Sequence, residues 1–429
     1  MTNPELSRHL ARHIIETLGS FGTPPTQGLQ HFNVGNQSLL SALDQFYLSS
    51  YLQDGGAAYK MVVGDYGSGK SHFLYCLRDL AWSRNFAVAK VDLSPIETPY
   101  NDQKRVYQAV VNNIIWHSSD TLTTDETGLI RFLNGTLTQL VGTTNISLEL
   151  LNNPLYRAII DTLEATTIDS TAYQAAILAY FDCLIRDQSD ELDSLTRWLL
   201  GERTTPEDTK HLRTLGVTGK ITRPNAFRML RSLCQIIRAL SYSGLVLLFD
   251  EVDRMSSVGG RAEKLATDTL REVIDRTRED LPGAMFVYAV PPQFITDIVP
   301  KYPALQQRLR APGKFSQINH FSPLISLDHL DLNEDDLMIA IGDKLIPIYE
   351  TAFNTQLDTK TQRANALILA NVARDLFLDI SHRRLFVKSF VVELSRQHYS
   401  QEHTITENEA QAILRGQVDS LLQTETPPY

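Results

Sequence analysis

Residues 57–71 read AAYKMVVGDYGSGKS, a short apolar run followed by a glycine-rich loop. The apolar run predicts a β-strand over 57–63, and the residues after the loop predict a helix over about 70–82. The loop matches the pattern GxxxxGK followed by Ser or Thr, in which glycines let successive backbone N–H groups turn toward phosphate oxygens. The sequence therefore predicts a phosphate-binding loop. The alternative is a glycine-rich turn that matches the pattern by chance.

The residues of this loop have separate expected roles. The Lys70 ammonium would reach the β- and γ-phosphates, and the Ser71 hydroxyl would ligate Mg²⁺. Backbone amides and the N-terminus of the following helix would surround the phosphates. The residues expected to bind the nucleotide are Gly64, Asp65, Tyr66, Gly67, Ser68, Gly69, Lys70, Ser71 and His72. ATP and Mg²⁺ are the expected ligands.

An acidic pair follows the apolar run LVLLF at 245–249. A continuous apolar run of this kind predicts a strand that is covered on both faces. Asp250 would hold Mg²⁺, and Glu251 would act as the base that polarises the attacking water. The alternative is an acidic pair that only ends a strand. Asp253 and Arg254 are expected to have structural roles alone.

Strands alternate with helices over much of the chain. Further strands are predicted at 86–93 and 284–290, with a weaker strand at 314–319. Helices are predicted at 3–19, 38–53, 261–278 and 302–310, and the chain after about 330 reads as helix. This order predicts an α/β fold of the P-loop NTPase type, with a parallel sheet flanked by helices.

A long helical insertion separates the two motifs. Lys70 and Asp250 lie 180 residues apart, whereas a minimal βαβ path needs only some tens of residues. Segments such as 103–117 and 126–140 have helical periodicity, and no strong strand is predicted between about 103 and 240. We expect this insertion to bind a partner or a substrate. The predicted divisions are an N-terminal helix over 1–28, a core over 29–322 interrupted at about 103–240, and a C-terminal helical lid over 323–429.

The composition excludes several classes of protein. The chain has 429 residues, 43% of them hydrophobic and 21% charged, which excludes a disordered or fibrous protein. Its three cysteines form no CxxC pair, so a disulfide scaffold or a cysteine zinc site is not expected. The N-terminus reads as an amphipathic helix, and the apolar runs are too short to span a bilayer. We therefore expect a cytoplasmic protein.

One basic stretch opposes the acidic total. The chain has a net charge of −10, but residues 203–238 contain eight Lys and Arg against two acidic residues. The stretch thus carries +6, and the rest of the chain carries −16. Arg228, Arg231 and Arg238 share a predicted helix face. Duplex DNA is the partner that such a face would bind through its phosphates, and the alternative is a solvated face that balances acidic neighbours.

The order of these motifs resembles that of AAA+ ATPases. The stretches that carry the resemblance are GLQHFNVG at 28–35, VVGDYGSGKSHFL at 62–74, SGLVLLFDEVDR at 243–254, REVIDRTRED at 271–280 and YPALQQRLR at 302–310. Within that class, the chain resembles the ATP-binding proteins of bacteriophage-exclusion (BREX) systems, the BrxC and BrxD family. The resemblance implies an oligomeric ATPase of anti-phage defence that acts on or near DNA. A helicase or methyltransferase of the same system is an implied partner.

The resemblance also assigns arginines. Arg308 or Arg310 would reach the nucleotide of a neighbouring subunit and neutralise charge on the γ-phosphate. Arg383 and Arg384, in the helical lid, would act on the nucleotide of their own chain. The alternative for each pair is an exposed helix face.

Two further features follow from the resemblance. Val34 and Gly35 would lie beside adenine, unless their segment is a plain turn. AAA+ proteins usually carry Asn, Thr or Ser at the end of the strand equivalent to 284–290, and this chain has only Tyr288 or Gln293 as substitutes. This departure leaves two functions open: an ATP-hydrolysing protein, or an ATP-gated scaffold with little hydrolysis that recruits a helicase or methyltransferase. A small-molecule P-loop kinase is a third, weaker interpretation.

Overall fold

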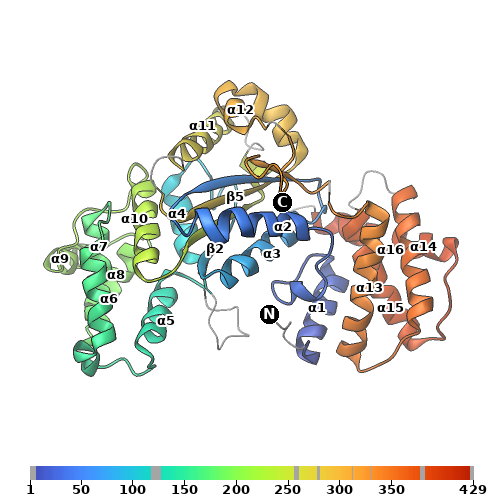
Figure 1. Cartoon of the computed structure of the whole chain (residues 1–429), viewed down its shortest axis with the longest axis horizontal. Helices are drawn as coiled ribbons and strands as arrows, with labels where there is room; N and C mark the ends of the chain where they lie inside the picture. Colours follow the sequence, from blue (N-terminus) through green and yellow to red (C-terminus); the bar gives the residue numbers. More distant parts are fainter. Residues whose placement is uncertain are drawn as a thin grey trace.

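The computed structural model describes residues 6–116, 127–255, 260–277, 281–311, 313–328, 330–376 and 382–425. Its centre is a six-stranded sheet with the strand order β3-β2-β4-β5-β1-β6 (Figure 1). The strands are β1 (Ala58–Val63), β2 (Phe86–Asp92), β3 (Ile114–Ile115), β4 (Gly244–Asp250), β5 (Ala284–Val290) and β6 (Leu324–Ser326). Paired strands run parallel except β2 and β3. The prediction of an α/β fold with a parallel sheet flanked by helices is confirmed, except that β3 runs antiparallel to β2.

Helices cover both faces of the sheet. Alternate side chains of β4 point to opposite faces, so Leu247 packs in one hydrophobic core and Leu248 in the other. Every residue of β4 and β5 is buried, as the continuous apolar runs predict. The helices on one face are α2 (Gln37–Leu43) and α3 (Lys70–Ser83), and those on the other include α4 (Gln103–Asn112), α10 (Ala226–Ala239) and α11 (Gly260–Arg276).

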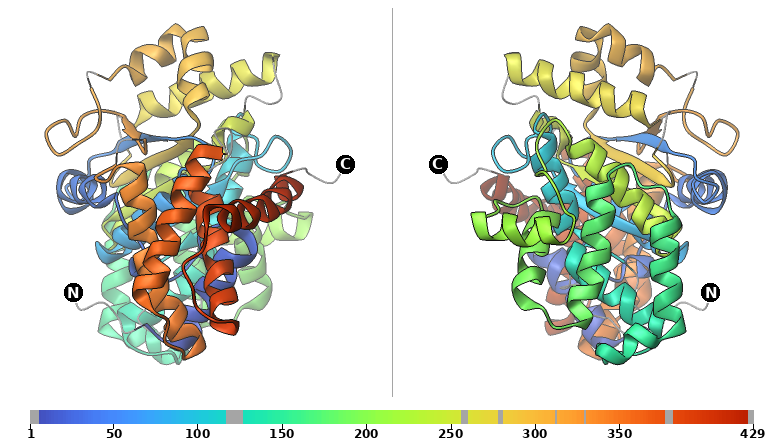
Figure 2. Two further views of the ribbon diagram at one scale, coloured as in Figure 1. Left: turned by 90° about the vertical axis from the view of Figure 1, so that its right-hand side faces the viewer. Right: turned by 90° about the vertical axis from the view of Figure 1, so that its left-hand side faces the viewer.

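Between β2 and β4, the described residues form helices and connecting loops apart from β3. Besides α4 and α10, its helices are α5 (Leu129–Val141), α6 (Pro154–Ala165), α7 (Thr171–Ile185), α8 (Ser189–Leu199) and α9 (Pro206–Thr214). They gather at one end of the molecule, at the left of Figure 1 and toward the viewer in the right-hand view of Figure 2. The short strand β3 was not predicted. The predicted helix boundaries at residues 3, 117, 126 and 278 lie outside the described residues.

The C-terminal helices form a second layer with the N-terminal helix. They are α13 (Glu334–Phe353), α14 (Thr359–Leu376), α15 (His382–Tyr399) and α16 (Glu407–Glu425), and α1 (Arg8–Phe21) packs against α13 and α15. The buried side chains of α1, which include Ala11, Ile15 and Leu18, recur at helical spacing and enter the same hydrophobic core. The left-hand view of Figure 2 shows this layer from its outer side. None of the helices within the described ranges is long and apolar enough to span a bilayer.

Shorter helical turns connect these elements. They are η1 (Leu29–His31), η2 (Asp44–Tyr51), η3 (Leu148–Asn152), η4 (Val252–Met255), η5 (Phe294–Ile298) and η6 (Val299–Lys301), and the helix α12 (Pro303–Leu309) follows η6.

The prediction of a strand at 314–319 is wrong, because the edge strand is β6 and the preceding residues form a loop. Lys60, in the middle of β1, donates hydrogen bonds of 2.8 Å to the backbone oxygens of His320 and Ser322. It donates a third, also of 2.8 Å, to the hydroxyl of Tyr47. Burial lowers the pKa of Lys60 to about 7. The loop therefore satisfies a buried amine with its carbonyls instead of extending the sheet.

Arg238 faces inward, so the prediction that it shares a basic surface with Arg228 and Arg231 is wrong. Its guanidinium donates to the backbone oxygens of Leu52 (3.1 Å), Ser243 (2.9 Å) and Gln53 (2.9 Å). These carbonyls belong to the turn before β1 and to the residue before β4. Arg238 thus ties α10 to the sheet.

Arg228 and Arg231 share one acidic partner. Their guanidinium nitrogens lie 3.6 Å and 3.8 Å from Oδ2 of Asp169. The alternative interpretation, a helix face that balances an acidic neighbour, fits these two residues. The exposed basic residues of the stretch are Arg203, Lys210, Arg213, Lys220, Arg223 and Arg228.

We predict that Arg238→Leu lowers the free energy of unfolding by about 2–3 kcal/mol, because three backbone carbonyls lose a charged donor. Urea unfolding followed by circular dichroism measures the change. Arg213→Leu, at an exposed position of α9, is the matched control and should leave the midpoint nearly unchanged. Equal midpoints for both variants would contradict the structural role of Arg238.

Candidate functional site

A cavity of about 280 Å³ lies where the phosphate-binding loop meets the C-terminal helical layer. It opens beside the carboxyl ends of β1 and β4, the edge at which open α/β sheets bind ligands. Its polar lining consists chiefly of Tyr66, Ser68, Lys70, Ser71, Asp250, Glu251, Asp253, Arg383 and Arg384. Its remaining lining comes from the segments at 18–24 and 32–36, from the residues around 327–341, and from α15. Parts of the chain that are distant in sequence therefore enclose one space.

The conformation of the loop requires its glycines. Gly67 and Gly69 have φ angles of 68° and 95°, a region that other residues occupy only with strain. A Cβ atom on Gly64 would lie 2.4 Å from Oγ of Ser68. The loop ends at Lys70, where α3 begins. The glycine spacing noted in the sequence thus has a direct structural cause.

Lys70 is held close to its own loop. Its ammonium donates to the backbone oxygens of Gly64 (2.8 Å) and Asp65 (2.9 Å). It also lies 5.1 Å from the centre of the Tyr66 ring. Burial lowers the pKa of Lys70, while four nearby carboxylates, Asp250 first among them, oppose that shift. The loop thus presents a half-buried cation to the cavity.

Ser71 and Asp250 meet at the floor of the site. The Ser71 hydroxyl donates a hydrogen bond of 2.7 Å to Oδ2 of Asp250, which is 6% exposed at the end of β4. A hydroxyl and a carboxylate side by side are the hard oxygen ligands that Mg²⁺ takes. No group of three or more His, Cys, Asp or Glu side chains in the described part of the chain is placed to hold a metal. The residues fit a Mg²⁺ that completes its coordination with phosphate oxygens and water.

Lys90 neighbours this pair, although no role was predicted for it from the sequence. Its ammonium forms an ion pair with Asp92 and lies 3.6 Å from Oδ2 of Asp250. β2 and β4 are parallel neighbours, and their register sets Asp92 opposite Asp250. The sequence held one signal for this site, which is the pair of charged residues Lys90 and Asp92 at the end of an otherwise apolar strand. Only the strand order shows that they lie beside the acidic motif.

Glu251 stands just beyond the strand in an unusual conformation. Its φ angle is 58°, in the left-handed region that non-glycine residues occupy at a cost of about 1–2 kcal/mol. Its carboxylate pairs with Arg254 at 2.8 Å, between Oε2 and Nε. Burial raises the pKa of Glu251, and Arg254 opposes that shift. Arg254, expected to be structural only, therefore contacts the predicted base.

Tyr66 links the loop to the segment after β4. Its hydroxyl forms a hydrogen bond with the carboxylate of Asp253, which lies in η4. The ring itself is 63% exposed at the mouth of the cavity. Asp253 thus contacts the loop directly, beyond the structural role expected for it.

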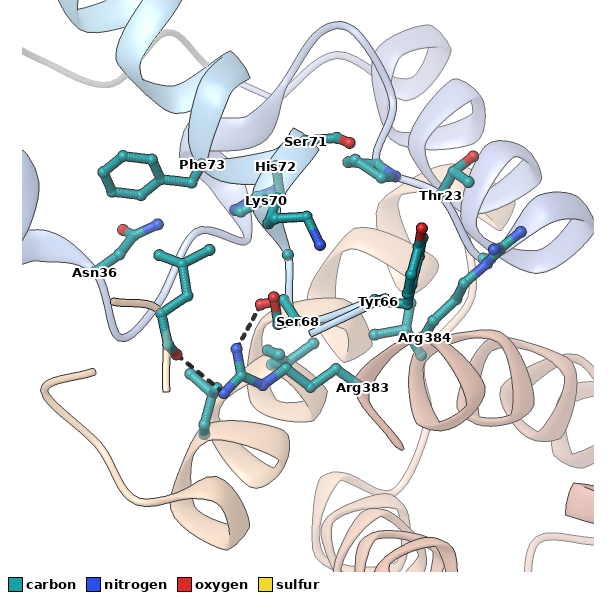
Figure 3. A pocket seen from close by; sticks show the side chains of 18 of the residues that line it. Thr23, Asn36, Tyr66, Ser68, Lys70, Ser71, His72, Phe73, Arg383 and Arg384 are labelled. Carbon is teal, nitrogen blue, oxygen red and sulfur yellow. Dashed lines mark hydrogen bonds between the residues drawn. The ribbon is translucent and has the colours of Figure 1, made fainter. Parts of the chain in front are cut away.

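Both predicted lid arginines border the cavity. Arg383 donates to the backbone oxygens of Ser68 (2.5 Å) and Leu327 (3.4 Å), the two dashed contacts in Figure 3. Arg384 donates to the backbone oxygen of Phe21, at 3.1 Å from Nη2. α15 therefore contacts the phosphate-binding loop through one arginine and the end of α1 through the next.

The segment before α2 forms another wall. Val34 lines the cavity, and a Cβ atom on Gly35 would lie 2.5 Å from Cδ1 of Leu337. Gly35 thus permits close packing on the C-terminal layer, while its neighbour faces the cavity. His72 is hydrogen-bonded to Asn33 at 3.0 Å, and burial lowers its pKa to about 4. His72 is therefore neutral near pH 7.

The two predicted finger arginines lie away from this cavity. Arg308 forms a two-pronged contact with Asp275 of α11, at 2.6 Å and 2.9 Å. Arg310 follows α12 and is exposed. α11 and α12 lie together at the top of Figure 1. Neither arginine is among the described residues that line the cavity, so action on a neighbouring subunit stays a prediction.

The substitutes considered for a polar residue after β5 do not line the cavity either. Tyr288 is fully buried, and its hydroxyl lies 2.6 Å from that of Tyr100. Gln293 is exposed beyond the end of the strand.

Comparison with known proteins gives a match to a family model alone. Neither the curated proteins nor the solved structures include a match. The family model described as "BREX system ATP-binding protein BrxC/D" matches residues 6–412, which include the loop, the acidic pair and the lid arginines. The resemblance noted in the sequence is thereby confirmed, and the chain belongs to the BrxC/D family of BREX system ATP-binding proteins.

Proposed function

We propose that this protein is a P-loop ATPase of the AAA+ type that binds ATP with Mg²⁺ in the cavity and hydrolyses it during anti-phage defence. The family description supports ATP binding and a place in a BREX system. The observation that carries the proposal is the 2.7 Å contact between Ser71 and Asp250. These residues are 179 positions apart, and P-loop nucleotide hydrolysis requires both at one metal.

Each residue of the site has a separate role in the proposed reaction. Backbone amides of the loop and the Lys70 ammonium bind the phosphates, and Ser71 and Asp250 hold Mg²⁺. When bound, Mg²⁺ neutralises charge on the phosphate oxygens. Glu251 accepts a proton from the water that attacks the γ-phosphorus, and ADP leaves as the bond to its β-phosphate oxygen breaks. Burial raises the pKa of Glu251, which makes its carboxylate a stronger base toward the attacking water.

The predicted divisions of the chain indicate which part acts as a lid over the nucleotide. We assign an N-terminal helix to 1–28, an interrupted core to 29–322 and a helical lid to 323–429. The contact of Arg383 with the loop supports a lid role, because a γ-phosphate near that loop would give its guanidinium a charged partner. β6 lies within 323–429 and pairs with β1, which anchors the start of the lid to the sheet.

Oligomerisation and partners extend the proposal. The protein forms a nucleotide-dependent homo-oligomer in the cytoplasm, in which Arg310 or Arg308 completes a neighbour's site. Arg310 is the better finger, since Arg308 is already paired with Asp275. The insertion at about 103–240 binds duplex DNA or a helicase or methyltransferase of the same system. The exposed residues Arg203, Lys210, Arg213 and Lys220 support the DNA contact.

A second candidate is an ATP-gated scaffold with little hydrolysis. The observation that favours it is the end of β5, where Tyr288 is buried against Tyr100 and does not face the cavity. A site without a polar side chain there holds the attacking water less firmly. Binding of ATP would then order the lid for a partner, and turnover would be slow.

We predict that Glu251→Gln keeps the ATP affinity within about threefold but lowers turnover by about 100-fold or more, because the amide cannot accept the proton. Calorimetry measures binding, and phosphate release measures turnover. Lys70→Ala is the companion variant and should lose binding as well. Unchanged turnover in Glu251→Gln would contradict the assigned base. A wild-type turnover far below about 1 s⁻¹ with a partner present would favour the scaffold.

We predict that Arg310→Ala lowers turnover by about tenfold or more without changing ATP affinity, because a finger acts on the transition state of the neighbouring site. Arg308→Ala should instead lower the melting temperature, since it releases Asp275. Mixing experiments test the finger: Arg310→Ala subunits added to Glu251→Gln subunits should restore part of the turnover, because some sites then have both groups. Turnover that depends on neither arginine would contradict the finger.

A further inference from the structure

The cavity also has an apolar lining, which comes from two parts of the chain. Phe32 and Val34 line it from the segment before α2, and Leu330, Leu337 and Ile341 line it from the C-terminal side. The two sides contact each other, because the amide of Asp331 donates to the backbone oxygen of Gly35 at 2.9 Å. Such a slot suits a flat aromatic ring, and a purine is the part of a nucleotide that fits it.

Asn36 is a buried polar residue in this slot. It is 4% exposed and lines the cavity, and its Oδ1 finds no hydrogen-bond partner among the described residues. Asn36 precedes α2, but its side chain does not cap that helix. The amide of Ser38 instead donates to Asp331 at 3.0 Å. The oxygen of Asn36 therefore does not accept the backbone hydrogen bond that an N-cap side chain usually accepts.

A neighbour of Asn36 indicates which end of its carboxamide is unpaired. Asn36 forms a side-chain hydrogen bond with Cys76 of α3 that lowers the thiol pKa against the larger effect of burial. A hydrogen bond that stabilises the thiolate is donated by the amide, so Nδ2 faces Cys76 and Oδ1 is the free acceptor. A modest rotation about the Cβ–Cγ bond, a broad torsion in asparagine, would present that oxygen to a ligand.

We propose that Oδ1 of Asn36 accepts a hydrogen bond from the 6-amino group of adenine and thereby selects ATP over 6-oxopurine nucleotides. The inference rests on the proposed function, because it assigns the base-selecting residue of the same nucleotide site. A purine 6-amino group is a donor at the position where inosine and guanosine nucleotides carry an acceptor oxygen. Two acceptors facing each other in a buried slot leave both unpaired, which weakens binding.

Other polar atoms of the lining are less suited to this role. Ser68 also carries a buried oxygen without a partner in the described chain, but it lies in the phosphate-binding loop. His72 is already hydrogen-bonded to Asn33. In Figure 3, Asn36 and Phe73 lie at one side of the view, opposite Tyr66 and Arg384. The unpaired oxygen at the apolar side is the feature that points to a base.

The test compares ATP with inosine triphosphate, which carries a 6-oxo group in place of the 6-amino group. Full-length Glu251→Gln protein, which should bind without turnover, is titrated with each nucleotide and Mg²⁺ by calorimetry. We expect ATP to bind about tenfold more tightly or better. Adding Asn36→Ala should reduce that preference to about twofold or less, mainly through weaker ATP binding. Asn113→Ala, an exposed asparagine after α4, is the matched control and should keep the preference.

The possible results distinguish a failure of the role given to Asn36 from a failure of the proposed function on which that role rests. Equal binding of both nucleotides before any change at Asn36 would overturn the inference alone, and this arm needs no further folded variant. A preference that survives Asn36→Ala would also overturn it, with ATP binding intact. Loss of binding of both nucleotides by the Glu251→Gln protein would instead overturn the proposed function and the inference together.

Discussion

The hydrogen bond between Ser71 and Asp250 is the contact on which the arrangement of the site depends. It joins the start of α3 to the end of β4 at 2.7 Å, across 179 residues of chain. Those two ends meet because β1, β5 and β4 are parallel neighbours and finish at one edge. The buried apolar strands hold that edge in place. The insertion does not disturb this edge. β2 and β4, the strands before and after the inserted helices, pair with each other along their whole length.

The sequence predicts the parts of the site whose cause is local. Gly67 and Gly69 need positive φ angles, and Asp250 ends a continuous apolar strand, so both motifs are visible without a structure. Arg383 was found only through the family resemblance. Lys90 was missed, because its relevance follows from strand order alone.

The errors share a physical cause, which is a partner distant in sequence. The loop at 314–319 reads as a strand, but the buried amine of Lys60 takes up the carbonyls that follow it. Arg238 reads as one of three surface arginines, but the carbonyls of Leu52 and Ser243 turn it inward. Residue spacing gives the face of a helix. It does not give the backbone groups that the face will meet.

At the cavity, the sheet and the C-terminal helices are connected in two places. α1 belongs to the C-terminal hydrophobic core, and the chain leaves it through Phe32–Asn36 to enter α2. α15 returns to the loop through the contact of Arg383 with Ser68. A shift of the C-terminal layer would therefore move Leu337 and Ile341, which face the segment at Asn36, together with Arg383. A purine in the slot would contact that layer at Leu337 and Ile341, and a phosphate at the loop would contact it at Arg383, so both would favour the same position of the layer. Base recognition and lid position are then parts of one equilibrium.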